Sequence, residues 1–302
     1  MKKKIIVKIS DGLGNQLFMY ANAFSLKKKH NLDLYIDNYS GYYNKKAIYN
    51  YILDNFNISS NYAPKKYIFA NFYRNILKKI YLLTDNLSIK KKFVFEKRDF
   101  NKSTFYSPIY IENTGKFFFL DGNFESEKYF LEYRNDLLNE FRLNDIKQFH
   151  NNKYLEIIKN QNVVSICVRQ NRFSERIKNK KSKIAREKSN LFLKETIDYI
   201  NNAIRFFKDK IDKPTFLIWS NDFTNLHKYF SENEFTFVRN EKNKILTDFY
   251  LLTQCKYFIV GPSTFHWWGA WLSNFENKIC VRPKNLNSSN NRDFWPEKWI
   301  SI

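Results

Sequence analysis

Short apolar runs alternate with segments in which apolar residues recur every three or four positions along most of the chain. Uninterrupted apolar runs are typical of buried strands, and the three-to-four spacing is typical of helices that cover a sheet. The pattern predicts strands at residues 4–9, 32–36, 117–120, 163–168, 215–219, 257–260 and 278–281. It predicts helices at residues 17–28, within 67–83, and at 127–141, 190–207, 246–255 and 265–271. This alternation favours an α/β fold with parallel sheets.

The length of 302 residues is enough for one large core or for two domains of ordinary size. The polar stretch at residues 144–152 is the best candidate for a boundary between domains. We therefore expect one domain at residues 1–150 and a second at residues 151–302.

Two strand–turn–helix segments stand out as places for an anion. In the segment nearer the end of the chain, Gly261 and Pro262 break an apolar run, and Ser263 or Thr264 can cap a helix that begins with Phe265. Free N–H groups at such a helix start suit a phosphate. The alternative is an aromatic helix packed into a core.

The other strand–turn–helix segment begins with the predicted strand at residues 4–9, and its turn contains Gly12 and Gly14. Its glycines allow a close approach of the backbone to a diphosphate. It is not the dinucleotide-binding fingerprint, because Leu17 stands where the third glycine is required.

The strand predicted at residues 163–168 leads directly into Arg169, with Arg172 three positions later. Ligands gather at the carboxyl ends of strands in open α/β sheets, and a guanidinium group matches the oxygens of a diphosphate. The alternative is an exposed basic loop that continues into the lysines between Lys178 and Lys188.

The formal charge of +21 makes nucleic acid, an anionic membrane surface and an anionic substrate possible partners. The alternative is a compositional bias, with lysine filling solvated positions. No apolar run is long enough to span a bilayer, and the start of the chain leads directly into a strand, which argues against a signal peptide. The three cysteines are far apart, which fits a reducing cytosol. The histidines form no metal-binding pattern, and no Asp-x-Asp pair occurs in the sequence. We therefore expect neither a metal nor a cofactor.

Five segments, taken in order, resemble the α-1,2-fucosyltransferases of glycosyltransferase family 11. The matching blocks are G-L-G-N-Q-L-F at residues 12–18, D-G-N-F-E-S-E-K-Y-F at 121–130, D-F-Y-L-L at 248–252, S-T-F-H-W-W-G-A-W-L at 263–272 and P-E-K-W-I at 296–300. The resemblance implies a GT-B fold, with two Rossmann-like domains facing a cleft. Residues 1–150 would form the acceptor-side domain, and residues 151–302 would bind a GDP-sugar.

The resemblance also implies an activity. It is the transfer of L-fucose from GDP-fucose to a sugar hydroxyl, with inversion and without a metal, in an α-1,2 linkage of a surface polysaccharide or O-antigen. The acceptor would be an oligosaccharide or a lipid-linked glycan, and the enzyme would be cytoplasmic. Its positive charge predicts peripheral contact with the anionic inner face of the plasma membrane. The donor-binding residues implied are Gly14, Asn15, Arg169, Arg172, Asp222, Asp248, Ser263, Thr264 and Phe265.

One block departs from the family. Its arginine motif reads H-x-R-R-G-D, whereas this chain has Cys167, Arg169, Gln170 and Arg172 at the corresponding positions. Arg169 keeps a charge for the diphosphate, and Arg172 is a candidate to restore the lost one. The catalytic base is then open. Glu175 is the nearest acid, and it is either the base or an ordinary partner of Arg172 or Arg176.

Two other functions stay open at this level. The altered motif is compatible with a related transferase that uses another GDP-sugar. A basic, non-catalytic nucleic-acid-binding protein would account for the charge, although no nucleic-acid-binding module is recognisable and the aromatic residues follow core patterns.

Overall fold

The structure is a computed structural model that describes residues 2–43, 48–70, 72–83, 87–96, 104–175, 182–241, 244–287, 289 and 291–302. The chain divides into two compact units, Met1–Asn144 with Ser289–Pro296, and Asp145–Ser288 with Glu297–Ile302. Every strand pair in the two sheets is parallel. The predicted α/β fold with parallel sheets is therefore confirmed.

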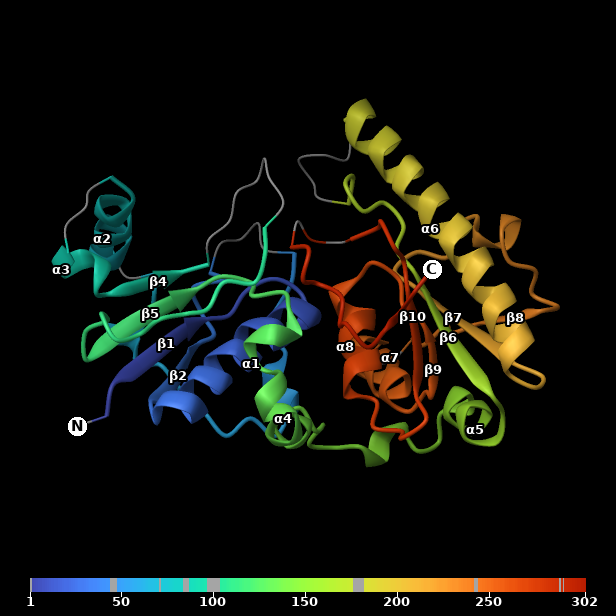
Figure 1. The fold of residues 1–302 in the computed structure, drawn as a ribbon, viewed down its shortest axis with the longest axis horizontal. Coiled ribbons are helices and arrows are strands. Elements are labelled where there is room, and N and C mark those ends of the chain that lie inside the picture. Colours follow the sequence, from blue (N-terminus) through green and yellow to red (C-terminus); the bar gives the residue numbers. More distant parts are fainter. Residues whose placement is uncertain are drawn as a thin grey trace. The chain divides into compact units, whose positions relative to one another are not determined.

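The helices and strands alternate along the chain as the apolar pattern indicates (Figure 1). The first unit contains β1 (Lys4–Lys8), α1 (Leu13–His30), β2 (Asp33–Asp37), β3 (Asn61–Tyr62), α2 (Phe72–Leu83), α3 (Leu87–Lys90), β4 (Phe93–Phe95), β5 (Phe117–Asp121) and α4 (Arg134–Glu140). The second contains α5 (Lys153–Asn160), β6 (Val163–Val168), α6 (Lys183–Lys210), β7 (Thr215–Ser220), β8 (Phe235–Phe237), α7 (Lys244–Thr253), β9 (Tyr257–Ile259), α8 (Thr264–Leu272), β10 (Ile279–Arg282) and β11 (Ile300–Ser301).

The sheet of the first unit has the strand order β3-β2-β1-β5-β4. Neighbouring side chains of a strand point to opposite faces, so one strand serves two layers. Ile6 of β1 joins Phe93 and Phe119 in a cluster that α2 and α3 cover. Ile5 and Val7 face the other side, where α1 packs on β1 and β2. Helices α1 and α2 thus lie on opposite faces of this sheet (Figure 1).

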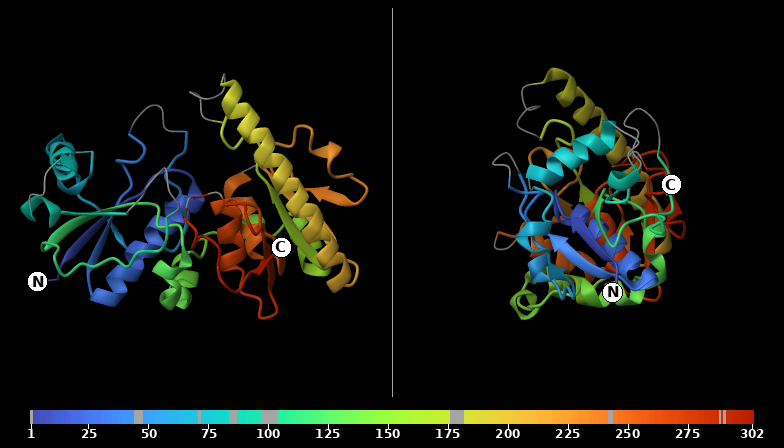
Figure 2. Two further views of the ribbon diagram at one scale, coloured as in Figure 1. Left: turned by 45° about the horizontal axis from the view of Figure 1, so that its top comes forward. Right: turned by 90° about the vertical axis from the view of Figure 1, so that its left-hand side faces the viewer.

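The sheet of the second unit has the order β11-β10-β9-β6-β7-β8. Its β6 is buried along its whole length, as a central strand covered on both faces should be. The long helix α6 covers one face (Figure 2). Its Ile200, Ala203 and Phe207 belong to a core cluster that also contains residues of β6, β7 and β9. Helices α7 and α8 pack against each other and complete the unit.

Each sheet has one point where the direction of strand addition reverses. The chain builds from β1 to β2 and β3 on one side, and then places β4 and β5 on the other side of β1, with β5 next to β1 and β4 at the edge. It builds likewise from β6 to β7 and β8, and then places β9 on the other side of β6. Such reversal points open a crevice at the carboxyl ends of the two flanking strands, where α/β proteins bind ligands.

The chain returns to the first unit near its end. Asp293 accepts hydrogen bonds from the Tyr106 amide at 2.7 Å and from Lys128 Nζ at 2.8 Å, and the Phe294 ring lies 6.3 Å from that of Phe18. The sequence had placed all residues from 151 to 302 in one domain. It did not anticipate this return, which rests on contacts between residues far apart in the chain.

Several element boundaries differ from the prediction. Residues 127–141 were expected to form one helix. Instead, the buried Phe130 separates two short 3₁₀ turns, and α4 begins after the second of them. Helix α6 begins seven residues earlier than expected, because the Ser182 hydroxyl caps it by accepting the Ala185 N–H at 3.2 Å. The short strands β3, β4, β8 and β11 and the helix α5 were not predicted. Among the described residues, no helix combines the length and the apolar character that crossing a bilayer requires.

The close approach of α7 and α8 provides a test of the packing. A Cβ atom added at Gly269 would lie 2.7 Å from Cβ of Leu252, which is fully buried. We expect Gly269→Ala to lower the free energy of unfolding by about 1–3 kcal/mol in urea denaturation, because overpacking outweighs the gain in helix propensity. In the control Gly115→Ala, the added atom meets nothing closer than 3.6 Å, so stability should change little. Equal stability of both variants would contradict this packing.

Candidate functional site

The turn after β9 contacts the end of β6 at backbone distance. A Cβ atom at Gly261 would lie 2.2 Å from the carbonyl oxygen of Cys167, so only glycine allows this approach. The contact falls at the reversal point between β6 and β9. The contact brings Cys167, two residues before Arg169, next to the turn that leads into α8.

A buried histidine fixes this turn. The Gly261 N–H donates to Nδ1 of His266 at 3.1 Å, and Nε2 of His266 lies 3.2 Å from the Ser165 hydroxyl. A backbone amide can only donate, so Nδ1 accepts and the proton resides on Nε2. Complete burial lowers the pKa of His266 to about 3, so the ring is neutral. The ring joins α8, the turn and β6. Ser165 in turn donates to the Tyr257 carbonyl of β9 at 3.2 Å.

The start of α8 lies directly after this turn. Ser263 is the N-cap residue in extended conformation and is buried, but its side chain makes no capping hydrogen bond. Thr264 and Phe265 are half-buried, and the Phe265 ring lies 5.5 Å from that of Phe249 in α7. The first N–H groups of a helix have no partner within the helix, so this end favours an anion.

Arg169 leaves the carboxyl end of β6 and pairs with Glu175. Its Nη2 lies 2.8 Å from Oε1 and 2.7 Å from Oε2 of that carboxylate, and both side chains are about a quarter exposed (24% and 22%). Glu175 had been considered as a partner of Arg172 or Arg176. Its partner here is Arg169, because the turn at Asn171 folds the segment back, with the Glu175 N–H bonded to the Asn171 carbonyl at 2.8 Å. Arg172 is half-buried in the same turn, and Arg176 lies outside the described residues.

The loops after β6 and β7 are tied together by amide side chains. Nε2 of Gln170 donates to the carbonyls of Asp222 and Thr224 at 2.6 and 2.9 Å, and the Gln170 N–H donates to Asn221 at 2.9 Å. The Asp222 carboxylate accepts from the Thr224 N–H at 2.9 Å and from Asn171 at 3.2 Å. Asp222 is therefore half-buried at this edge, with its carboxylate already engaged in shaping the loop.

Asp248 is a buried acid in α7. The helix predicted at residues 246–255 begins earlier, at Lys244, so Asp248 lies beyond its first turn. Burial raises its pKa to about 6, although Nδ2 of Asn240 donates to it at 2.7 Å. Burial raises the pKa of the Cys167 thiol at the end of β6. The charge of Arg169 lowers this pKa and the charge of Asp248 raises it, each by less than burial does.

Gly14 and Asn15 belong to the first unit. They were predicted in a turn before a helix at Leu17, but α1 begins at Leu13, so both lie in its first turn. Gly14 is buried and Asn15 is half-buried. Gln16 is fully buried, and its amide bonds the Asp11 carbonyl at 2.9 Å and the Asn50 carbonyl at 2.8 Å.

Among the described residues, the second unit therefore gathers two arginines, a helix start and three acids (Glu175, Asp222 and Asp248) at the carboxyl edge of its sheet. Arg169, Arg172, Asp222, Ser263, Thr264 and Phe265 follow β6, β7 and β9, which are neighbours, and Asp248 lies on α7. A cation beside a helix start can stabilise a phosphate or diphosphate. Within the described part of the chain, no three His, Cys, Asp or Glu side chains cluster as a metal would require.

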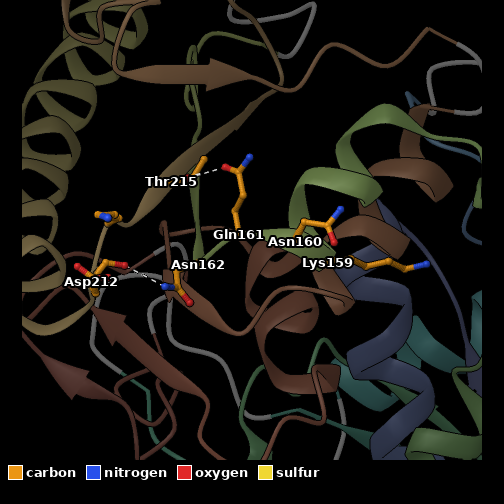
Figure 3. A pocket seen from close by; sticks show the side chains of 7 residues that line it. Lys159, Asn160, Gln161, Asn162, Asp212 and Thr215 are labelled. Carbon is orange, nitrogen blue, oxygen red and sulfur yellow. Dashed lines mark hydrogen bonds between the residues drawn. The ribbon is translucent and has the colours of Figure 1, made fainter.

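A polar pocket of about 500 Å³ lies at the opposite edge of this sheet (Figure 3). It is lined by the end of α5, the segments that precede β6 and β7, and the first residue of β7, namely Lys159, Asn160, Gln161, Asn162, Asp212, Lys213 and Thr215. Gln161 and Thr215 share a hydrogen bond of 2.7 Å there. This pocket contains none of the residues predicted from the sequence.

Sequence reasoning missed four residues that hold the carboxyl edge together: Gln170, Asn221, Asn240 and His266. The first three are amides in loops, for which no local pattern predicts a partner. His266 had a signal, because it is a polar residue at a core position inside an aromatic helix.

Comparisons with known proteins agree with the motif pattern. Residues 4–302 match the family described as Glycosyl transferase family 11. The chain is 27% identical to the Alpha-1,2-colitosyltransferase of Escherichia coli, with 99% of this chain and 98% of that protein covered. It is 26% identical to the O-antigen biosynthesis glycosyltransferase WbnK of Escherichia coli, with 97% and 99% covered.

Solved structures share the fold. The fucosyltransferase NodZ from Bradyrhizobium superposes with a TM-score of 0.52 over 89% of this chain and 92% of NodZ, at 14% identity. NodZ has also been co-crystallised with GDP. The likeness confirms a GT-B-type fold with two Rossmann-like units, as the family resemblance implied.

The buried imidazole gives a pH-dependent prediction. His266→Phe leaves the Gly261 N–H without an acceptor, which should lower the free energy of unfolding at pH 7 by about 1–3 kcal/mol. Below the ordinary pKa of 6.5, the unfolded wild type binds a proton that the folded state refuses, so wild-type stability falls on acidification. The cost of the substitution should therefore shrink by about 2 kcal/mol between pH 7 and pH 5.

Urea denaturation at the two pH values measures this cost. His227→Phe is the control, because His227 is exposed. Its effect should stay within about 0.5 kcal/mol. A cost of His266→Phe that grows on acidification would show that the ring is charged in the folded protein.

The raised pKa of Asp248 in α7 predicts the opposite dependence of the free energy of unfolding on pH. With a raised pKa, folded Asp248 holds its proton to a higher pH than the unfolded chain does, so wild-type stability falls as the pH rises from 4 to 6. Asp248→Asn removes this loss. The variant should gain on the order of 2 kcal/mol relative to wild type between pH 4.5 and pH 7 in urea denaturation. The control Asp209→Asn, at an exposed carboxylate of α6, should show no such gain.

Proposed function

The chain belongs to glycosyl transferase family 11, and from this premise we propose that it transfers L-fucose from GDP-fucose to a sugar hydroxyl of an O-antigen precursor. The reaction proceeds with inversion and without a metal, and it forms an α-1,2 linkage. The observation that supports the proposal most is that Arg169 and the start of α8 follow the carboxyl ends of the neighbouring strands β6 and β9, at the reversal point of the second sheet. The relative WbnK, which matches almost the whole chain, supports a role in O-antigen synthesis, because it is described as an O-antigen biosynthesis glycosyltransferase.

In this proposal Arg169 and the N-terminus of α8 bind the diphosphate. When the bond from the anomeric carbon to the diphosphate oxygen breaks, negative charge grows on the leaving oxygen. A guanidinium and helix N–H groups already in place stabilise that charge without reorganisation. Ser263, Thr264 and Phe265 present this helix start, and Arg172 adds positive charge. Asp222 and Asp248 are assigned to the guanine or the ribose, and the assignment of Gly14 and Asn15 to donor binding stays a prediction.

Glu175 is proposed as the catalytic base. The acceptor hydroxyl must lose a proton as it attacks, and a carboxylate is the usual acceptor of that proton. In the structure this carboxylate is paired with Arg169, the same group that we assign to the diphosphate. A bound diphosphate would compete for the guanidinium and release Glu175, which couples donor binding to the availability of the base.

A second donor has an observation in its favour. A relative that matches almost the whole chain is described as a colitosyltransferase. Colitose is L-fucose without its 3-hydroxyl, so the two donors differ by one hydrogen-bonding group. A site that pairs this hydroxyl should reject the colitose donor by orders of magnitude, whereas an apolar site should accept both. The ratio of kcat/KM for GDP-fucose and GDP-colitose decides between them.

The donor site is tested by thermal melting with GDP, GDP-fucose, GDP-mannose, UDP and ADP, each with and without EDTA. At a hundredfold excess over its dissociation constant, a ligand of the folded state adds about 2.7 kcal/mol of stability. We expect a guanine-selective shift that EDTA does not change and that Arg169→Ala abolishes. The control Arg205→Ala, at an exposed position of α6, should keep the shift.

Turnover separates the two proposed roles. Arg169→Ala should lower kcat by about 10²–10³, as expected for the loss of a preorganised charge contact. Glu175→Gln should keep the GDP shift but lose most of the activity. No shift with any GDP compound would overturn the donor assignment. Tight, salt-dependent binding of DNA or RNA in its place would favour the nucleic-acid alternative.

A further inference from the structure

Helix α2 uses one of its faces to pack on the first unit. Leu77 and Tyr81 lie against the cluster around Phe119, and the Tyr81 ring is 4.8 Å from that of Phe95. Arg74 stands over the Phe119 ring at 4.7 Å, and Lys78 pairs with Asp121 at 2.8 Å. These residues follow the three-to-four spacing of a single helix face, which the sheet covers.

A second apolar stripe runs along the outward side of the same helix. Tyr73, Ile76 and Leu83 are exposed by 62%, 40% and 82%. Steps of three and seven residues keep side chains on one side of a helix, so the three share one narrow face. An amphipathic helix needs only one apolar face to pack on its own domain. Ile76 and Leu83 therefore offer an apolar surface to an external partner.

The surroundings of this stripe are strongly basic. Residues 65–92 contain one acid, Asp85, and eight basic residues: Lys65, Lys66, Arg74, Lys78, Lys79, Lys90, Lys91 and Lys92. Arg74 and Lys78 are used against the sheet, but Lys65, Lys66, Lys79, Lys90 and Lys91 are exposed. The exposed lysines thus lie on α2 itself, as Lys79 does, and in the neighbouring segments of the chain before and after it.

We propose that the outward face of α2 and its exposed lysines bind the surface of an anionic lipid bilayer. Helices that lie in a membrane interface have this composition, with apolar side chains that enter the lipid and lysines that contact anionic head groups. A second copy of the chain is a poorer occupant, because it would bring two basic faces together. This surface would provide the peripheral membrane contact that the positive charge predicts. It rests on the proposed function only for its purpose, access to a lipid-linked acceptor.

The test is co-sedimentation of the full chain with phosphatidylcholine vesicles that contain or lack phosphatidylglycerol, at low and high salt. Wild type should sediment only with the anionic vesicles and should be released by high salt. Ile76→Ser/Leu83→Ser and Lys65→Glu/Lys66→Glu should each weaken binding at least tenfold. The control Ile184→Ser/Leu191→Ser removes two exposed apolar side chains of α6 and should bind as wild type does.

The outcomes separate this surface from the enzymatic proposal. Thermal melting with GDP is measured for every variant, and all are expected to keep the wild-type shift and melting temperature. Wild type that fails to bind anionic vesicles, or α2 variants that bind as tightly as wild type, would overturn the membrane surface. If the α2 variants change their oligomeric state but bind vesicles as wild type does, the membrane surface is also overturned, and a second copy of the chain is the partner of this face. Loss of the GDP shift in wild type would overturn the donor assignment and leave the membrane surface intact.

Discussion

The backbone contact between Gly261 and the Cys167 carbonyl is the constraint on which the carboxyl edge of the second unit depends. It lets the end of β6 and the turn after β9 approach more closely than any side chain would allow. The contact leaves the Gly261 amide in the interior, where an unpaired donor would be costly, and Nδ1 of His266 accepts it. One neutral ring thereby sets where α8 begins. The buried Trp267 and Trp268 then hold the helix in place.

The charges at this edge are arranged around that framework. Arg169 is oriented by Glu175, and the loops that carry Arg169 and Asp222 are joined through Gln170. The family motif has an arginine and an acid where this chain has Gln170 and Arg172. The structure gives Gln170 a use that an arginine could not fulfil in the same way, since its amide both donates to two carbonyls and stays neutral. The departure from the motif thus replaces charge by loop fixation, and the remaining charge is concentrated in Arg169 and Arg172.

The first unit contributes a different property. Its sheet is covered by α1 on one face and by α2 on the other, and only α2 carries a second apolar stripe with lysines around it. A large net positive charge spread evenly would say little about a partner. Its concentration around an exposed apolar stripe favours an anionic surface over an anionic small molecule. Such a surface would hold the enzyme where lipid-linked glycans occur.

The sequence by itself determined the α/β class, the order of most strands and helices, and the family, because these depend on local periodicity and on motifs that are contiguous in the chain. It also placed Arg169 at a strand end, since β6 is an uninterrupted apolar run. It could not give His266 a role, because that ring meets Ser165, 101 positions away, only once β6 and β9 are neighbours. It did not anticipate the burial of Asp248, which depends on the packing of α7, or the return of residues 289–296 to the first unit. Tertiary structure decided these points, because burial and long-range pairing follow from the order of strands in the sheet, which no local pattern encodes.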